Sequence, residues 1–342
     1  MLPRPGTPLK QARTQMPKVT NPISAFDRMN ASVLMAVTPE YGKVKTARRR
    51  SKTNIEARPG PFAMEPDFVT IEGKRLRYAR GGKADAPTLL LLSPLPQSII
   101  CFDQIWPMLA DRFNLVALDL PGFGRSEGGA EVMTFEAQSR ILDAFVRHMD
   151  LTDFHIVGPD VGMPVALHYV LHREHRASSL IVGAGPCVMP TSNGSIIDKA
   201  VKSGFWRQVF QIAGSGAFVE GGSRLAYVDY SPSDAEIADY VASYRGRIGP
   251  IMEWFKRYPE NLATIDPHLT DLDLPVQLFW GDLDQFLLID TAQRVHERLK
   301  RSKLTVFENC GHFPFHDKRD AFAAMIADWV ETGHLALDRE PG

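Results

Sequence analysis

Residues 154–162 read Phe-His-Ile-Val-Gly-Pro-Asp-Val-Gly, and the fold class follows mainly from this stretch. Its first four residues form an apolar run of strand length, and a helical pattern continues at 164–171. Gly158 and Gly162 permit a tight turn from strand to helix, which would hold Asp160 above the sheet at the helix N-terminus. An aspartate at the start of a helix is also a common N-cap. This stretch alone therefore leaves open whether Asp160 performs chemistry or caps the helix.

Apolar runs of strand length alternate with amphipathic patterns over most of the chain. After a hairpin of Phe68–Ile71 and Arg75–Tyr78 around Glu72-Gly73, strands are expected at Thr88–Leu92, Leu115–Leu118, Phe154–Val157, Leu180–Val182, Val276–Trp280 and Leu304–Phe307. Helices are expected at Phe135–Met149, Pro164–Leu171, Ala292–Leu299 and Ala321–Val330. Near-continuous apolar strands separated by helices predict an α/β fold with a mainly parallel sheet covered on both faces.

The alternation stops between Pro186 and His268, where the pattern is mostly helical and rich in aromatic residues. We expect residues 186–268 to form a helical cap over the carboxyl edge of the sheet, where such sheets bind ligands. The predicted core then comprises residues 65–185 and 269–333. The remaining residues, 1–64, are expected to form a basic, mobile extension.

Two further polar sites follow core strands later in the chain. Asp282 and Asp284 come directly after the strand at 276–280, and His312 follows the strand at 304–307. Asp160, an aspartate after the strand at 276–280 and His312 each follow a core strand. Their order along the chain is one of the known orders of a catalytic triad: nucleophile, acid, histidine. Asp284 is the candidate acid by spacing, and Asp282 is expected to be a turn residue.

These motifs resemble the α/β-hydrolase superfamily, and in particular its aspartate-nucleophile branch of epoxide hydrolases and dehalogenases. The resemblance covers about residues 66–333 and includes Asp119–Ser126, Trp280–Asp284 and Gly311–Pro314. It implies an α/β-hydrolase fold with an inserted cap. The Asp119–Ser126 segment is expected to be a structural turn without a chemical role.

An aspartate nucleophile restricts the reaction. A carboxylate is already ionised, and its attack on an epoxide carbon or on a carbon bearing a halide gives an alkyl ester on the enzyme. His312 would then take a proton from the water that hydrolyses this ester, while Asp284 orients the imidazole. The predicted partners are a small-molecule substrate and water. We expect no cofactor and no metal.

Hydrolysis of the ester requires backbone donors for the oxyanion. The N–H of Val161, next after the nucleophile, is one expected donor. The resemblance places the second in the loop Ser93-Pro94-Leu95-Pro96, at the N–H of Leu95. Pro94 stands where most relatives carry glycine, so this loop departs from the family pattern.

The donor for the leaving group is not defined by the sequence. Relatives place two tyrosines in the cap, and the matching positions here are Phe210 and Phe255. Tyr244 precedes an arginine, like a cap Tyr-Arg pair of some dehalogenases, and is the candidate donor for either chemistry. Trp206 and Trp254 are further pocket candidates. Packing within the cap is the alternative for both tryptophans and for every cap tyrosine: Tyr227, Tyr230, Tyr240, Tyr244 and Tyr258.

Three functions stay open at this point. An epoxide hydrolase and a dehalogenase would use the same triad, and the products, a diol or an alcohol plus halide, separate them. Val161 in place of a halide-binding tryptophan favours the epoxide, whereas the two cap phenylalanines do not. A catalytically silent member that binds a small apolar ligand is the third, and it would form no covalent intermediate.

Composition narrows the class of protein. Apolar residues make up 44% of the 342 residues, enough for a large core, and 39 basic against 40 acidic residues argue against a nucleic-acid binder. Residues 1–58 hold twelve basic and three acidic residues, a local charge of +9. No apolar run is long enough to span a bilayer. The three cysteines give no paired disulfide framework, so a reducing compartment, the cytoplasm, is expected. The sequence leaves the oligomeric state open.

Overall fold

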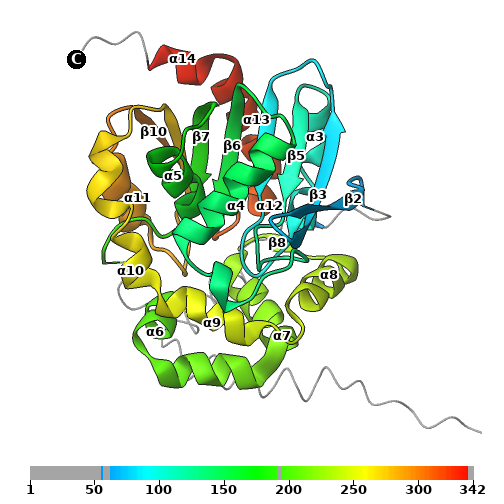
Figure 1. Cartoon of the computed structure of the whole chain (residues 1–342), viewed down its shortest axis with the longest axis vertical. Helices are drawn as coiled ribbons and strands as arrows, with labels where there is room; N and C mark the ends of the chain where they lie inside the picture. The colour runs from blue at the N-terminus through cyan, green and yellow to red at the C-terminus, as the bar shows by residue number, and fades with distance from the viewer. Residues whose placement is uncertain (1–54, 57–61, 191–194, 338–342) are drawn as a thin grey trace, which may run out of the picture.

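A computed structural model describes residues 55–56, 62–190 and 195–337 (Figure 1). One sheet contains eight strands in the order β10-β9-β7-β6-β4-β5-β3-β2. Neighbouring strands run parallel except around β3, which is antiparallel to both β2 and β5. The strands are β2 (Pro66–Ile71), β3 (Lys74–Gly82), β4 (Thr88–Leu92), β5 (Asn114–Leu118), β6 (Phe154–Pro159), β7 (Ala177–Gly183), β9 (Val276–Gly281) and β10 (Ser302–Phe307).

The expected strands and the mainly parallel sheet are confirmed. Strand β4 covers the residues predicted for it, and the other strands are longer than predicted by one to four residues at one end or both. In β3 the pairing continues through Gly81 and Gly82, which lie opposite Leu115 and Asn114 of β5. The apolar pattern ends earlier than the strand because backbone pairing does not need an apolar side chain.

The hairpin between β2 and β3 is also confirmed. Its two-residue loop has a φ of 46° at Glu72 and 74° at Gly73. Two consecutive residues with positive φ give the turn whose twist matches a β-hairpin, and glycine occupies one of them without strain. This hairpin adds the antiparallel edge to an otherwise parallel sheet.

Helices cover both faces of the sheet. Helices α4 and α5 pack against each other in front of the sheet in Figure 1, while α12 and α13 lie behind it, where α13 also contacts α3. These elements, with their short helical neighbours, are η1 (Ile99–Phe102), α3 (Trp106–Ala110), η2 (Ala130–Val132), α4 (Phe135–His148), α5 (Gly162–His172), α11 (Ile289–His296), α12 (Pro314–Asp317), α13 (Arg319–Asp328), η4 (Trp329–Gly333) and α14 (His334–Ala336).

Between β7 and β9 the chain forms a separate group of helices, the helical layer, which lies below the sheet in Figure 1. Its longest helix is kinked at Gly214, whose φ is 79°. In the part of the chain that is described, no helix is both long and apolar enough to cross a membrane. The layer consists of α6 (Ile196–Lys202), α7 (Gly204–Ala226), β8 (Tyr230–Ser231), α8 (Asp234–Tyr244), α9 (Ile248–Lys256), α10 (Tyr258–Leu262) and η3 (Asp266–Asp271).

The N-terminal segment differs from the prediction near its end. The short strand β1 (Ile55–Glu56) pairs in parallel with β8 of the helical layer. Asp103 Oδ1 accepts hydrogen bonds from Ala63 N at 2.6 Å and Met64 N at 3.2 Å, and the Met64 side chain is buried. The expectation of a mobile extension through residue 64 is therefore wrong for residues 62–64. Residues 1–54 and 57–61 lie outside the described part of the chain.

Candidate active site

Asp160 occupies the junction of β6 and α5 in a strained backbone conformation. Its φ is 50°, a region that residues other than glycine seldom adopt. The turn is tight because a Cβ at Gly158 would lie 2.8 Å from the carbonyl oxygen of Gly162. Helix α5 has Val161 as its N-cap residue, without a side-chain capping bond. The capping interpretation of Asp160 is thus wrong, and its carboxylate is available at the carboxyl edge of the sheet.

The three residues expected to form the triad lie together. His312 Nδ1 is 2.7 Å from Asp284 Oδ2, and His312 Nε2 is 3.6 Å from Asp160 Oδ1. The second oxygen of Asp284 accepts hydrogen bonds from the backbone N–H groups of Phe286 at 2.8 Å and Leu287 at 3.1 Å. Asp284 is therefore fixed on both oxygens, and it fixes the orientation of the imidazole in turn.

The neighbouring carboxylate has a different task. Asp282 Oδ1 accepts a hydrogen bond from Cys310 N at 3.1 Å, which ties the loop after β9 to the loop after β10. Backbone bonds reinforce this link, because Leu283 N donates to Cys310 O at 2.9 Å. The structure thus places Asp282 in a turn and Asp284 on the histidine.

His312 is held between two carboxylates inside the protein. Burial alone would lower the pKa of its imidazole, but the charge and hydrogen bond of Asp284 and the nearby charge of Asp160 outweigh burial and raise the pKa to about 10. The ring is 3% exposed. The raised pKa favours an imidazolium in the resting site, and removal of the Asp160 charge would lower the pKa of His312.

One backbone donor contacts the other oxygen of Asp160, and a second is expected next to it. Leu95 N donates to Asp160 Oδ2 at 2.7 Å, although Pro94 replaces the family's glycine just before it. The N–H of Val161 lies at the N-terminus of α5, where backbone N–H groups have no partner within the helix. The two donors expected for an oxyanion thus come from the two segments that meet at Asp160.

A pocket opens from Asp160 into the helical layer. Its polar side chains are Asp160, Tyr258 and His312, and the rest of its wall is apolar. Both predicted phenylalanines, Phe210 and Phe255, belong to the wall. The other lining residues are Leu95, Pro96, Ile197, Val209, Ala213, Ala217, Phe218, Gly221, Gly222, Leu225, Phe286 and Leu287.

The two candidate tryptophans lie outside this wall. Trp206 is half-buried and packs against Phe205, with ring centroids 5.5 Å apart. Trp254 is fully buried, and its Nε1–H donates to the hydroxyl of Tyr258 at 3.1 Å. Trp254 thus supports the pocket through its hydrogen bond to Tyr258.

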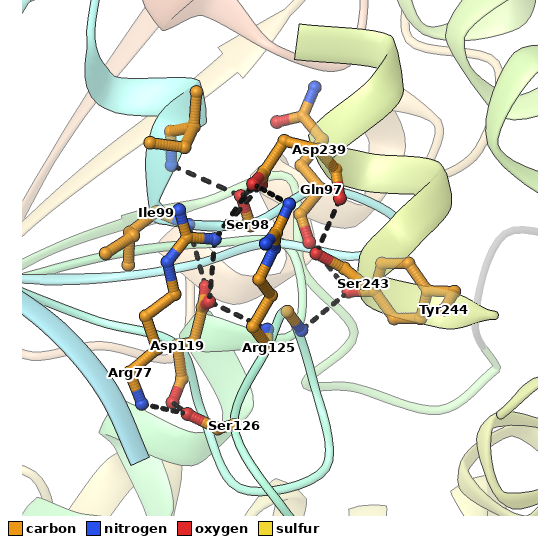
Figure 2. Close-up of polar contacts among 12 residues, drawn as sticks. Arg77, Gln97, Ser98, Ile99, Asp119, Arg125, Ser126, Asp239, Ser243 and Tyr244 are labelled. Atoms are coloured by element: carbon orange, nitrogen blue, oxygen red, sulfur yellow. Dashed lines mark hydrogen bonds and ion pairs between the residues drawn. The ribbon is translucent and has the colours of Figure 1, made fainter. Parts of the chain in front are cut away.

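Tyr244 is not the pocket donor that its local sequence suggested. Its hydroxyl donates to the backbone oxygen of Gln97 at 2.7 Å and accepts a bond from Gly124 N at 3.1 Å (Figure 2). The single hydroxyl proton is therefore used outside the pocket. The local Tyr-Arg pattern carries no information on which way the last residue of α8 points.

Tyr258 is the hydroxyl that the sequence did not single out. It lines the pocket, and it accepts a hydrogen bond from Trp254, which leaves its own proton without an acceptor among the described residues. Burial and then the charge of Asp160 raise the pKa of its phenol well above the usual value, so it stays protonated. Tyr258 begins α10, two residues after the end of α9, and no local sequence signal marks it as facing the pocket.

Comparison with known proteins identifies the family of the fold. The model of the α/β-hydrolase fold family matches residues 87–319. The chain belongs to the α/β-hydrolase fold family. This α/β-hydrolase is 22% identical to the Bacillus subtilis hydrolase YugF over 266 residues, which cover 77% of this chain and 96% of the relative.

Two further proteins similar to this α/β-hydrolase have names that describe different reactions. A 2-hydroxy-6-oxononadienedioate/2-hydroxy-6-oxononatrienedioate hydrolase of Escherichia coli is 21% identical over 286 residues, covering 80% of this chain and 98% of the relative. The solved structure of haloalkane dehalogenase DbeA from Bradyrhizobium elkani aligns with a TM-score of 0.68 and 21% identity, covering 80% of this chain and 99% of that chain. At this identity the likeness establishes a hydrolase fold, and the reaction has to be argued from the site.

Proposed function

We propose that this α/β-hydrolase opens epoxides through an alkyl ester on Asp160 and then hydrolyses that ester with His312. One observation carries the proposal. Asp160 has a strained backbone, and its carboxylate has a backbone donor on Oδ2 and the imidazole of His312 near Oδ1. A carboxylate in the nucleophile position suits attack on an sp3 carbon. The helical layer would act as the cap that closes the apolar pocket over a small apolar substrate.

In the first step, Oδ1 of Asp160 would attack an epoxide carbon, and the bond from that carbon to the ring oxygen breaks. The released alkoxide takes the hydroxyl proton of Tyr258. Formation of the ester removes the charge of Asp160, so the pKa of His312 falls from its raised resting value. The proton on His312 can then replace the one that Tyr258 lost.

In the second step, neutral His312 takes a proton from a water molecule that attacks the carbonyl carbon of the Asp160 ester. The N–H groups of Leu95 and Val161 stabilise the oxyanion that forms on Oδ2. Collapse of this intermediate breaks the bond from the carbonyl carbon to the ester oxygen, the departing alkoxide takes the second proton of the former water from the new carboxyl group, and the diol leaves the carboxylate of Asp160 beside a protonated His312. All protons are accounted for within the pocket and the added water.

Tyr258 favours the epoxide over a halide. An alkoxide leaving group needs a proton, and Tyr258 provides one from the pocket wall. A halide leaves as an anion and needs hydrogen-bond donors, whereas the side chains at Leu95 and Val161 beside the nucleophile are apolar. Haloalkane dehalogenation with the same triad is the second candidate, and the test below separates the two.

The test is the intact mass of the His312→Gln variant after incubation with epoxides and haloalkanes that the wild type turns over. The variant should trap the ester, with a mass increase equal to the whole epoxide. A haloalkane would add its own mass less that of the hydrogen halide. Asp160→Ala is the matched control and should stay unmodified. An unmodified His312→Gln protein in the presence of a true substrate would refute the two-step mechanism.

A further inference from the structure

Helix α8 holds the middle of the loop that carries the Leu95 N–H. This loop, residues 93–99, is the oxyanion loop. The hydroxyl of Tyr244 donates to Gln97 O at 2.7 Å, and Ser98 Oγ donates to Asp239 Oδ2 at 2.5 Å (Figure 2). Both partners belong to α8, and both contacts lie within three residues of Leu95. The helical layer, rather than the sheet, therefore fixes this part of the loop.

The ends of the oxyanion loop are held by the sheet side. Ser93 N donates to Leu118 O of β5 at 3.0 Å. Ile99 N donates to Asp119 Oδ1 at 2.7 Å, directly after β5. With both ends fixed by the core, the contacts from α8, together with the hydrogen bond from Gln97 Nε2 to the hydroxyl of Tyr227, hold the intervening residues. The position of the Leu95 N–H over Asp160 then depends on α8.

The α8 contacts are themselves anchored by buried charges. Arg77 Nη1 lies 3.1 and 3.2 Å from the two oxygens of Asp239, and Arg125 Nη2 lies 2.7 Å from Oδ1. Arg77 also pairs with Asp119 at 3.8 Å, so two arginines balance two carboxylates (Figure 2). Arg77 and Asp239 are 5% and 6% exposed. A satisfied network of this kind has one favourable geometry, and it links α8 to β3 and to the turn after β5.

The 119–126 turn is fastened to the same end of α8. Tyr244 accepts a bond from Gly124 N at 3.1 Å. Arg247, which follows α8, donates to Gly124 O at 2.8 Å and to Ser126 O at 2.6 Å. The turn that the sequence suggested to be structural thus supports the residue that holds the oxyanion loop.

We propose that Tyr244 and Asp239 are positioning residues for the Leu95 N–H and act on hydrolysis of the Asp160 ester. This inference rests on the proposed ester mechanism. In the first step Asp160 loses charge, so a weaker Leu95 N–H contact should not slow attack. In the second step charge develops on Oδ2, and loss of one oxyanion donor costs about 10²–10³ in rate. A displaced donor should therefore slow the second step alone.

The experiment compares Tyr244→Phe with Tyr240→Phe by rapid-quench mass spectrometry, using an epoxide that the wild type turns over. Both tyrosines are fully buried and lie one turn apart on α8, but the Tyr240 hydroxyl has no hydrogen-bond partner among the described residues. We expect Tyr244→Phe to keep the alkylation rate and to hydrolyse the ester about 10-fold more slowly, so that ester accumulates. Tyr240→Phe should behave like the wild type.

A second pair of variants keeps the test independent of how well Tyr244→Phe folds. Ser98→Ala removes the other contact with α8 and should also slow hydrolysis of the ester. Ser243→Ala is its control, since the Ser243 hydroxyl bonds only to a backbone oxygen of its own helix, that of Asp239, at 2.8 Å. Equal slowing of both steps in Tyr244→Phe and Ser98→Ala would indicate general loosening and overturn the inference.

The inference and the proposed function fail in different ways. If His312→Gln traps the ester but Tyr244→Phe and Ser98→Ala hydrolyse it at the wild-type rate, only the positioning role is wrong. If no variant carries an ester while the wild type turns the epoxide over, the ester mechanism is wrong and the positioning role falls with it.

Discussion

Replacing Tyr258 by phenylalanine removes one oxygen atom and retains the ring. The Tyr258 hydroxyl lines the pocket with Asp160 and His312, and its proton has no acceptor among the described residues. Proton donation to a leaving group contributes about 10²–10⁴ in rate. Because water can enter the vacated space and donate less efficiently, we expect alkylation by an epoxide to slow about 10²-fold. This corresponds to about 2.7 kcal/mol of transition-state stabilisation.

The variant should also lose some folding stability, by a free energy of similar size or smaller. The buried Trp254 Nε1–H loses its acceptor, and an unsatisfied buried donor costs about 1–3 kcal/mol. Urea unfolding measures this loss of stability. The loss should be too small to unfold the variant under assay conditions. Tyr240→Phe, which removes a hydroxyl outside the pocket wall, should change neither quantity appreciably.

Single-turnover kinetics with an epoxide and a haloalkane make the assay specific. A halide needs no proton to leave, so Tyr258→Phe should slow alkylation by the epoxide more than alkylation by the haloalkane. Hydrolysis of the ester should be nearly unchanged in both cases. An unchanged epoxide alkylation rate would return Tyr258 to a packing role and refute the reasoning above.

Three further predictions concern stability, the acid of the triad and the N-terminal segment. The pKa of His312 is raised from 6.5 to about 10 by folding, so the stability it contributes is complete below pH 6.5 and is lost as the pH rises towards 10. Between pH 7 and 9, urea unfolding should show a decline in stability up to about 1.4 kcal/mol per pH unit steeper in the wild type than in His312→Gln. Asp284→Asn should leave alkylation within about threefold but slow ester hydrolysis at least 10²-fold in rapid-quench experiments, and equal slowing of both steps would contradict the orienting role. A chain beginning at Pro59 should retain steady-state turnover, because no triad residue precedes it; loss of activity would show that the β1–β8 pairing supports the site.

The fold and the triad could be predicted because their signals are local. Apolar runs of strand length identify the strands, and the small residues around Asp160 define its turn. Asp284 and His312 each follow a strand, and the carboxyl ends of parallel strands meet at one edge of the sheet. Chain order and strand ends were therefore enough to bring three distant residues together.

The leaving-group donor could not be predicted because its position depends on how the helices of the layer pack. Tyr244 and Tyr258 both end or begin a short helix, and their local sequences do not reveal which one faces Asp160. The orientation of α8 is fixed by the Asp239–Arg77 pair, whose members are 162 residues apart. Such a pairing has no local signature, so only the folded chain shows that Tyr244 points to the oxyanion loop and Tyr258 to the pocket.

The same limit applies to the end of the N-terminal segment. A basic and proline-containing composition predicts a mobile extension, yet Met64 is buried and its backbone N–H donates a hydrogen bond to Asp103. The deciding partner lies 39 residues later in the chain. The composition of a segment shows how polar it is. It does not show whether a carboxylate far along the chain binds the backbone of that segment.

The origin of the oxygen atom in the first turnover tests the central claim most directly. Enzyme in excess over an epoxide is allowed to react once in water labelled with ¹⁸O, and the peptide containing Asp160 and the diol are analysed by mass spectrometry. Water that attacks the ester carbonyl leaves its oxygen in the carboxylate, so the label should appear in Asp160 and the first diol should be unlabelled. Label in the first diol, with unlabelled Asp160, would show that water attacks the substrate directly and would contradict the ester mechanism.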